Sequence, residues 1–280
     1  MTTRDNSARF RAPNLDVSPE QQEIIDNNFQ GMQYVVPTEL VELPTKGLFY
    51  PEGHPLHNKQ EIEIKTMTAK EEDLLVNKSL LQKGIALDRV LQSIIVDSAI
   101  RLDDLFIGDK NAIIVAARVS AYGADYAANI TCPSCTTTQK YSFDLEDRSV
   151  KYVNDAAIPG VEVTERGTFK LKLPRCGAII ETKLLCGYDE KRLLKKGKRM
   201  DLPLTEQFKS FIVSVDNIED RGMIDQFIDV MPAFDSKYLR ETYSKIIPNI
   251  DLTQYFECTN CGHSQDMEVP FTVEFFWPRS

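Results

Sequence analysis

The stretch Ala128-Asn-Ile-Thr-Cys132-Pro-Ser-Cys135, followed by Lys140-Tyr-Ser-Phe-Asp-Leu145, is the most informative part of this sequence. Alternation of apolar and polar residues predicts two strands, and the turn between them carries a Cys-x-x-Cys pair. The same device returns near the end of the chain as Tyr255-Phe-Glu-Cys258-Thr-Asn-Cys261, followed by Asp266-Met-Glu-Val-Pro-Phe271. The sequence therefore predicts two similar hairpins, with residues 136 to 257 between their cysteine pairs.

Each of these turns presents two thiolates to one side, which is half of the tetrahedral site that a zinc ion prefers. Cys132, Cys135, Cys258 and Cys261 together predict a structural four-cysteine zinc site, with each hairpin forming half of a zinc ribbon. The segment between the halves is far longer than the spacer of a free-standing ribbon. A metal bound here would act as a clasp that ties the end of the chain to its middle, so residues 132 to 261 are expected to fold as one unit.

Other interpretations of the four cysteines remain open. A thioredoxin-like redox pair requires a helix N-terminus after a strand, and neither pair has that setting. Disulfides are uncommon in the cytoplasm, whereas a degenerate site without metal is a real alternative. His263 could replace one cysteine as a ligand, although a histidine at this distance from Cys261 is more often a neighbouring surface residue.

The rest of the chain predicts a mixture of helices and short strands. Alternation at Glu61–Lys65 indicates a strand. The apolar run at 111–119 indicates either a central helix or a buried strand, and its alanine content favours the helix. Further helices are expected at 68–84, 87–100, 184–194, 205–215, 223–230 and 236–246, and a hairpin at 160–173. The predicted fold class is α+β, with mixed helices, short antiparallel strands or hairpins, and a split four-cysteine clasp that resembles a zinc ribbon.

Changes in composition divide the chain into three regions. Residues 1–36 are expected to form an extended arm with a short helix that begins at Ser18. Residues 37–130 form a predicted helical α+β region that includes an extended, exposed strap at 43–51. Residues 131–280 form a predicted α+β region bounded by the two cysteine hairpins.

Composition and charge narrow the classes of function. The 280 residues include 42 acidic and 33 basic residues and three histidines, for a formal net charge of -9. An acidic surface is repelled by phosphate backbones, so nucleic acid is not the expected partner. No run of about 18 apolar residues and no secretory signal is present, which predicts a cytoplasmic chain without a membrane span. Few histidines and no recognised catalytic motif predict that the protein is not an enzyme and has no small-molecule substrate.

Two further groups of residues are candidate contacts for partner proteins. Six basic residues surround Gly197, and they predict either a patch for an acidic neighbour or a solvated helix end: Lys191, Arg192, Lys195, Lys196, Lys198 and Arg199. The large side chains of Leu48, Phe49 and Tyr50 lie in the expected strap and form the second group.

Several of these motifs together resemble the T4-type bacteriophage baseplate hub family. The resemblance rests on the segments Leu43–Pro51, Ile64–Asp73, Leu105–Arg118, Tyr122–Tyr126 and Cys132–Cys135. It implies a structural or assembly component of the central hub of a contractile tail, with other baseplate and tail proteins as partners. The expected location is the virion baseplate, after assembly in the host cytoplasm, and no active site is transferred by the resemblance.

Two other functions stay open from the sequence. A transient assembly chaperone would share the family's motifs but leave the particle. A zinc-ribbon accessory protein that binds nucleic acid is suggested by the cysteine pairs and the basic run, and it is opposed by the net charge.

Overall fold

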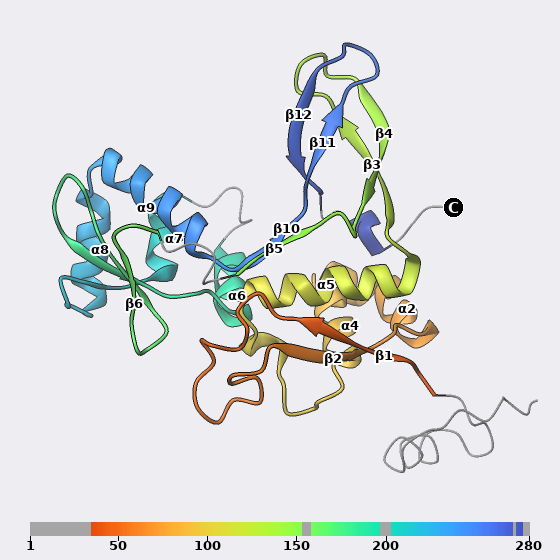
Figure 1. Cartoon of the computed structure of the whole chain (residues 1–280), viewed down its shortest axis with the longest axis horizontal. Coiled ribbons are helices and arrows are strands. Elements are labelled where there is room, and N and C mark those ends of the chain that lie inside the picture. Colours follow the sequence, from red (N-terminus) through yellow and green to blue (C-terminus); the bar gives the residue numbers. More distant parts are fainter. Residues whose placement is uncertain (1–34, 153–157, 197–202, 271–272, 277–280) are drawn as a thin grey trace, which may run out of the picture.

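The computed structural model describes residues 35–152, 158–196, 203–270 and 273–276. The molecule is organised around helix α5 (Ile107–Tyr122), which crosses the middle of Figure 1. This helix is apolar nearly all round, and Ala112, Ile113, Val115 and Ala117 are almost fully buried. An all-round apolar helix must be covered on every side, so α5 is the element on which the neighbouring elements pack.

Strand β1, helix α4, helix α6 (Gly187–Lys196), strand β10 (Asn249–Asp251) and the 3-10 turn η5 (Val273–Phe276) pack on α5. Strands β1 (Thr38–Glu42) and β2 (Glu61–Lys65) pair with each other, as the alternation in β2 predicts. Helices α2 (Ala69–Val76), α3 (Lys78–Gln82) and α4 (Ala86–Ile94) follow, and a 3-10 turn, η2, covers Leu102–Asp104. A capping box at Thr68 begins α2, and in it the Thr68 N–H donates to the Glu71 carboxylate at 3.0 Å.

Helix α4 ends at Ile94, earlier than the predicted 87–100. The backbone becomes extended at Ile95, which forms an isolated antiparallel bridge to Ile64, and the Val96 N–H donates to the Glu63 carbonyl. The chain leaves the helix because β2 offers it backbone partners. The local sequence around Ile95 does not indicate this contact, because Ile64 is far away along the chain.

A second group of elements lies beside the first. Strands β6 (Val161–Val163), β7 (Phe169–Lys172), β8 (Ile179–Thr182) and β9 (Ile212–Val215) form an antiparallel sheet in that order. Helices α7 (Leu204–Phe211), α8 (Arg221–Val230) and α9 (Ala233–Ile246) accompany it, as seen at the left of Figure 1. Helix α6 (Gly187–Lys196) lies between the two groups and contacts η2, α5 and α7. The helix predicted at 205–215 is wrong over its last four residues, because β9 pairs with β8 there.

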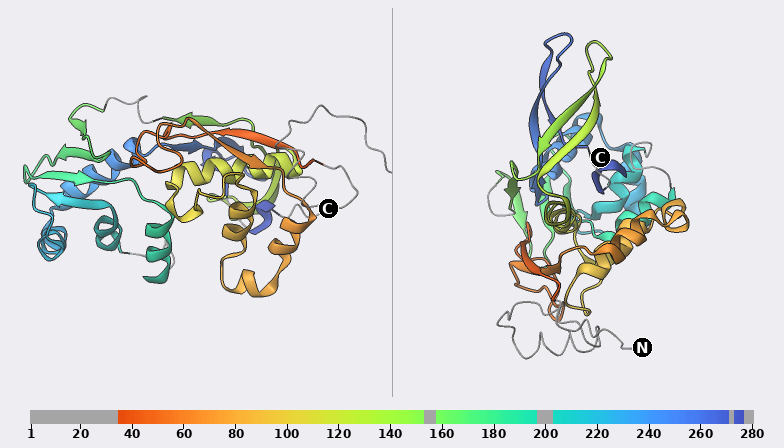
Figure 2. Two further views of the ribbon diagram at one scale, coloured as in Figure 1. Left: turned by 90° about the horizontal axis from the view of Figure 1, so that it is seen from below. Right: turned by 90° about the vertical axis from the view of Figure 1, so that its right-hand side faces the viewer.

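The predicted cysteine hairpins are confirmed as four strands. Strands β3 (Asp125–Thr131) and β4 (Thr138–Asp144) pair with each other, as do β11 (Thr253–Glu257) and β12 (Ser264–Glu268). The two hairpins stand side by side and project from the rest of the molecule in Figure 1 and in the right-hand view of Figure 2. We call these two hairpins, with their cysteine turns, the arm, which is distinct from the N-terminal arm expected at residues 1–36.

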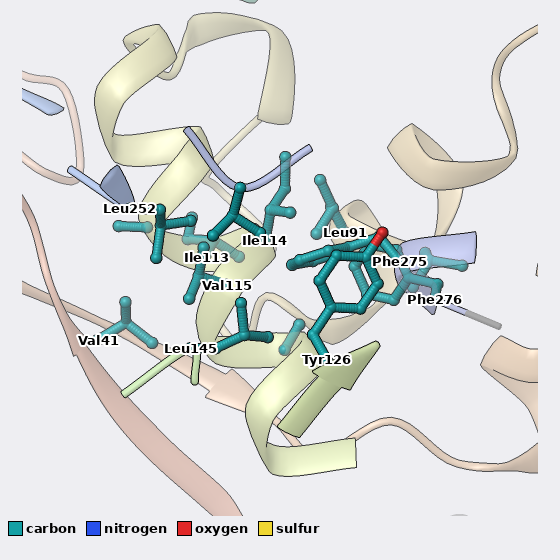
Figure 3. Close-up of a cluster of buried hydrophobic side chains, with 14 of the residues drawn as sticks. Val41, Leu91, Ile113, Ile114, Val115, Tyr126, Leu145, Leu252, Phe275 and Phe276 are labelled. Carbon is teal, nitrogen blue, oxygen red and sulfur yellow. The ribbon is translucent and has the colours of Figure 1, made fainter. Parts of the chain in front are cut away.

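The buried side chains form two hydrophobic cores. The first combines residues between Val41 and Leu145 with residues from Leu252 to Phe276, and Figure 3 shows Leu252, Phe275 and Phe276 beside Ile113 and Ile114 of α5. The second contains residues between Phe169 and Ile246. Strands β5 (Ser149–Lys151) and β10 (Asn249–Asp251) pair where the chain passes from one core to the other. The end of the chain therefore completes the core that its first half begins.

The fold class is α+β with four clustered cysteines, as the sequence predicts. The division into regions 1–36, 37–130 and 131–280 stays a prediction, and the helix expected after Ser18 lies outside the described residues. Of the helices within the described residues, none is long and apolar enough to cross a membrane.

The segment at 43–51 folds as a compact series of turns instead of an extended strap. Thr45 is fully buried, and its N–H and hydroxyl donate to the Asp109 carboxylate at 3.0 and 2.6 Å. The Tyr50 hydroxyl donates to the same carboxylate at 2.7 Å. Gly47 has φ +72, and a Cβ there would lie 2.4 Å from the Lys59 carbonyl oxygen, so only glycine fits this turn. A buried carboxylate on α5 therefore anchors the segment.

Candidate metal centre

Both cysteine turns have the same backbone geometry. In the first, the Cys132 N–H donates to the Thr137 carbonyl and the Thr136 N–H donates to the Cys132 carbonyl. In the second, Cys258 makes the same two bonds with His263 and Gly262. The equivalent residues Thr136 and Gly262 have φ values of 58° and 68°, which glycine adopts freely and threonine at a cost. The two turns are thus two copies of one thiolate-presenting loop.

The four sulfur atoms meet at the far end of the arm. All four lie within 4.8 Å of one another. The Sγ of Cys132 lies 3.8 Å from that of Cys261, and the Sγ of Cys135 lies 3.7 Å from that of Cys258. A regular tetrahedron with metal–sulfur bonds of about 2.3 Å has sulfur–sulfur edges of about 3.8 Å. The spacing therefore fits a single tetrahedrally coordinated metal ion.

Burial within the cluster is graded from the stem outward. Cys132 and Cys258, the first cysteine of each turn, are buried, whereas Cys135 is half-buried and Cys261 is exposed. Cys132 and Cys258 also belong to the first hydrophobic core. A site with four thiolate ligands leaves no position for a reactive water. Its chemistry is structural: it joins residues that are more than 120 positions apart in the sequence.

Polar neighbours set the protonation of the sulfurs. The hydroxyl and backbone N–H of Thr137, with the side-chain amide of Asn260, stabilise the thiolate and lower the pKa of Cys135 to about 5. The backbone N–H of His263 favours the Cys261 thiolate, but desolvation and the three neighbouring thiols outweigh it and raise the pKa of Cys261 to about 11. The Cys135 sulfur is thus ionised at neutral pH and can bind a cation directly. A bound metal would displace the protons of the other thiols.

Hydrogen bonds between the hairpins hold the two cysteine pairs in register. The Gln139 amide donates to the Glu257 carbonyl at 3.0 Å, and its oxygen accepts from the Thr259 N–H at 2.9 Å. The Tyr141 hydroxyl donates to the Tyr255 carbonyl at 2.9 Å. Asn260 also reaches across and donates to Thr137 at 3.1 Å. These side chains orient the ligands from outside the cluster.

Sequence reasoning placed the four cysteines together but did not identify these supporting residues. Gln139 and Asn260 lie on different hairpins, and their partners are more than 110 residues away in the sequence. The only available signal was their position in or beside the turns. His263, considered as a ligand, is not among the clustered residues, and its ring nitrogen lies 3.4 Å from the Gln265 amide oxygen.

The basic residues around Gly197 are only partly described. Lys191 forms ion pairs with Asp88 and Asp103, and Arg192 forms one with Asp189 at 3.3 Å. Lys195 is exposed on α6. The side chain of Lys196, together with Lys198 and Arg199, lies outside the described residues. The role of this run in partner binding stays a prediction, and two of its members already have partners within the chain.

The three large side chains of the 43–51 segment have different surroundings. Leu48 is 47% exposed, whereas Tyr50 is only 3% exposed. The Phe49 ring lies 5.5 Å from the ring of Phe169, so it connects this segment to the second core. Tyr50 is buried, and its hydroxyl donates a hydrogen bond to Asp109. Of these three side chains, Leu48 is therefore the exposed candidate for a partner contact.

Comparison with known proteins gives one match. The model of a family described as T4 bacteriophage base plate protein matches residues 51–277, which is most of the chain. No curated protein and no solved structure matches. The matched range includes α5, the second core, most of the first core and all four cysteines.

Proposed function

Because this chain belongs to the T4 bacteriophage base plate protein family, we propose that it is a structural or assembly component of the central hub region. It is a structural part of the virion tail baseplate, and its partners are other phage tail proteins. The finer proposal is that it belongs to the hub of a contractile tail and works through protein–protein contacts, without catalysis. The family match over residues 51–277 carries this proposal.

An exposed apolar segment supports a function in protein–protein contacts. Val230-Met-Pro-Ala-Phe234 joins α8 to α9, and its end residues are 78% and 57% exposed. Consecutive apolar side chains in contact with water are costly unless a partner covers them. A component that is permanently bound to neighbouring proteins can have these side chains covered, whereas a free monomer leaves them in water.

The hub proposal is tested by chemical cross-linking and mass spectrometry of purified baseplates. We expect the chain in finished particles, cross-linked to proteins nearest the tail axis. Cross-links confined to the periphery would contradict the hub position. Presence in assembly intermediates and absence from finished particles would favour the transient chaperone, and DNA binding that weakens steeply with salt would favour the nucleic-acid accessory protein.

We propose further that the cysteine cluster holds a structural zinc ion. Four thiolates at tetrahedral spacing suit zinc, and with zinc bound the site supplies cross-linking and no reaction. The alternative metal centre for four thiolates is an iron–sulfur cluster, which absorbs visible light. Zinc is the favoured ion because the sulfur spacing matches a single small ion.

Metal analysis of the parent chain and of a Cys258→Ser variant tests the zinc proposal. We expect about one zinc per parent chain, and in the variant a loss of metal with an unfolding free energy lower by roughly 3 kcal/mol or more. Cys176→Ser is the matched control, because Cys176 is exposed and lies outside the cluster. Parent protein without metal, or equal stability of the two variants, would contradict the proposal.

A further inference from the structure

The end of the arm differs in charge from the rest of the molecule. Charged residues make up 27% of the sequence. Residues 126–139 and 258–265, which include both cysteine turns, contain no Asp, Glu, Lys or Arg. Charges resume directly beyond these limits, at Asp125, Lys140, Glu257 and Asp266. The part of the arm that reaches farthest from the body in Figure 1 therefore has no Asp, Glu, Lys or Arg side chain, and its ionisable groups are the four cysteines and His263.

This end of the arm, residues 126–139 and 258–265, is called the charge-free end because it has no Asp, Glu, Lys or Arg. It is exposed and polar. Its outward side chains offer hydroxyl and amide groups, and the exposed ones include Ser134, Thr136, Thr138, Thr259, Asn260 and Ser264. A surface that only faces water gains solubility from charge. The centre of a protein–protein contact avoids charge, because burying an unpaired ion is costly, whereas uncharged donors and acceptors can be satisfied across the contact.

Strand β3 adds a second, independent observation. Among the described residues its only strand partner is β4, so its other backbone edge has no strand beside it. Natural sheets protect such edges with charged residues. The outer strand of the other hairpin, β12, follows this rule with Asp266 and Glu268, but β3 carries no charge from Tyr126 to Thr131. An unprotected edge is a template for strand addition by another chain.

The arm is also held rigid before any partner arrives. The bonds of Gln139 and Tyr141 between the hairpins and the cluster of four cysteines fix the two hairpins against each other. A rigid element loses little conformational entropy on binding, so it can form a specific contact over a small area.

We propose that the charge-free end of the arm is a docking surface on which another baseplate protein adds an extended, uncharged polar strand along the open edge of β3. This inference rests on the proposed function, because the partner is a neighbour in the baseplate. The absence of lysine and arginine from this end argues against nucleic acid as the occupant. The backbone of β3 provides affinity, and the hydroxyl and amide side chains provide specificity.

A charge placed on β3 tests the inference. Asn129 and Ser142 are both exposed, and they lie on neighbouring strands of the same hairpin, where Asn129 faces Lys140 and Ser142 faces Ala127. Asn129→Lys puts a protecting charge on the open edge, and Ser142→Lys puts the same charge on the inner strand. Asn129→Ser is the conservative variant. The amount of each chain per baseplate is measured in particles from phages that carry each variant.

We expect all three variants to keep the parent's metal content. Asn129→Lys, which places a second lysine opposite Lys140, should lose at most about 1 kcal/mol of stability, which is about a fivefold change in the unfolding equilibrium. Asn129→Lys should lower the amount per baseplate by roughly tenfold or more, since an unpaired charge in a buried contact weakens binding by at least that factor. Ser142→Lys and Asn129→Ser should match the parent. Normal incorporation of Asn129→Lys, or equal loss of Ser142→Lys, would overturn the docking surface alone. A parent chain that is absent from finished baseplates would instead overturn the proposed function on which it rests.

Discussion

At the scale of single residues, Asp109 anchors the 43–51 segment to α5. It is fully buried, and its carboxylate accepts hydrogen bonds from the backbone and hydroxyl of Thr45 and from the hydroxyl of Tyr50. It lies in the first turn of α5. Its partners were not predicted, because they are 59 and 64 residues away.

Replacing Asp109 by alanine should destabilise the protein by roughly 3 kcal/mol. The change leaves two buried hydroxyl groups and one N–H without their acceptor, and it releases the 43–51 segment from α5. Chemical denaturation measures the effect. Glu52→Ala, at an exposed carboxylate near that segment, serves as the control and should change stability by about 0.5 kcal/mol or less. Similar stability of the Asp109 variant and the control would contradict this account of the anchor.

The four cysteines show what sequence alone can predict about the site. Their identity and spacing indicated a shared cluster, and the structure confirms that the four sulfurs meet. The supporting bonds of Gln139 and Asn260 join two hairpins whose relative placement depends on the rest of the fold. Ligand type is a local property of the sequence, whereas ligand support is a property of the assembled hairpins.

At the scale of elements, α5 packs so closely on the segment before β10 that one position admits only glycine. A Cβ on Gly108 would lie 2.0 Å from the Pro248 carbonyl oxygen. Gly108→Ala should therefore cost roughly 2 kcal/mol of stability, although alanine favours helix. In the control Gly222→Ala, on α8, the new Cβ meets no backbone atom and lies 3.3 Å from the Asp220 Oδ1 atom, so a smaller cost is expected. Thermal unfolding of both variants tests this, and a stabilised Gly108→Ala variant would disprove the close packing.

A group of ion pairs joins α4, α5 and α6. Lys110 lies 2.9 Å from both Asp88 and Glu190, and Lys191 lies 3.1 Å from Asp88. Burial alone would raise the pKa of Asp88, but the two lysines outweigh it and hold that pKa below its ordinary value. A lowered carboxyl pKa contributes stability above the unfolded-state value and loses it as the pH falls through the folded-state value.

Asp88→Asn should therefore destabilise the protein by about 2 kcal/mol at neutral pH, and the difference from the parent should shrink below about pH 4. Denaturation at a series of pH values provides the measurement. The exposed pair of Arg166 and Glu219 offers a control, since Glu219→Gln should have almost no effect at any pH. A pH-independent loss in Asp88→Asn would show that packing, and not charge, accounts for the effect.

The predicted elements failed where distant partners decide the backbone. The apolar run of α5 and the alternation of β2 were sufficient for correct predictions, because each pattern reports burial of the element itself. Residues 212–215 continue a helical pattern in the sequence, yet they form β9, because their backbone pairs with that of β8 in an antiparallel sheet. Local preference was overridden by pairing with residues about 30 positions away.

At the scale of the whole molecule, the cysteine cluster and the second core lie in different parts of the structure (Figure 1). The arm continues into the first core, whereas β7, β8 and α9 belong to the second. If the cluster holds the proposed zinc ion, removal of that ion should therefore loosen the molecule unevenly. We expect hydrogen exchange to accelerate by roughly tenfold or more in β3, β4, β11 and β12, and to change little in β7 and β8. Uniform acceleration throughout would contradict this independence.

The return of the chain at β10 has a consequence for biosynthesis. The second core is built from residues 169 to 246, so it can close on the ribosome as soon as that stretch has emerged. The first core lacks Leu252, Phe256 and Phe275 until residues 252–275 have been synthesised. Residues 41–145 therefore stay partly unpacked until β11 and the residues that follow it have been synthesised. A chain truncated before β11 would lose the packing of this first core.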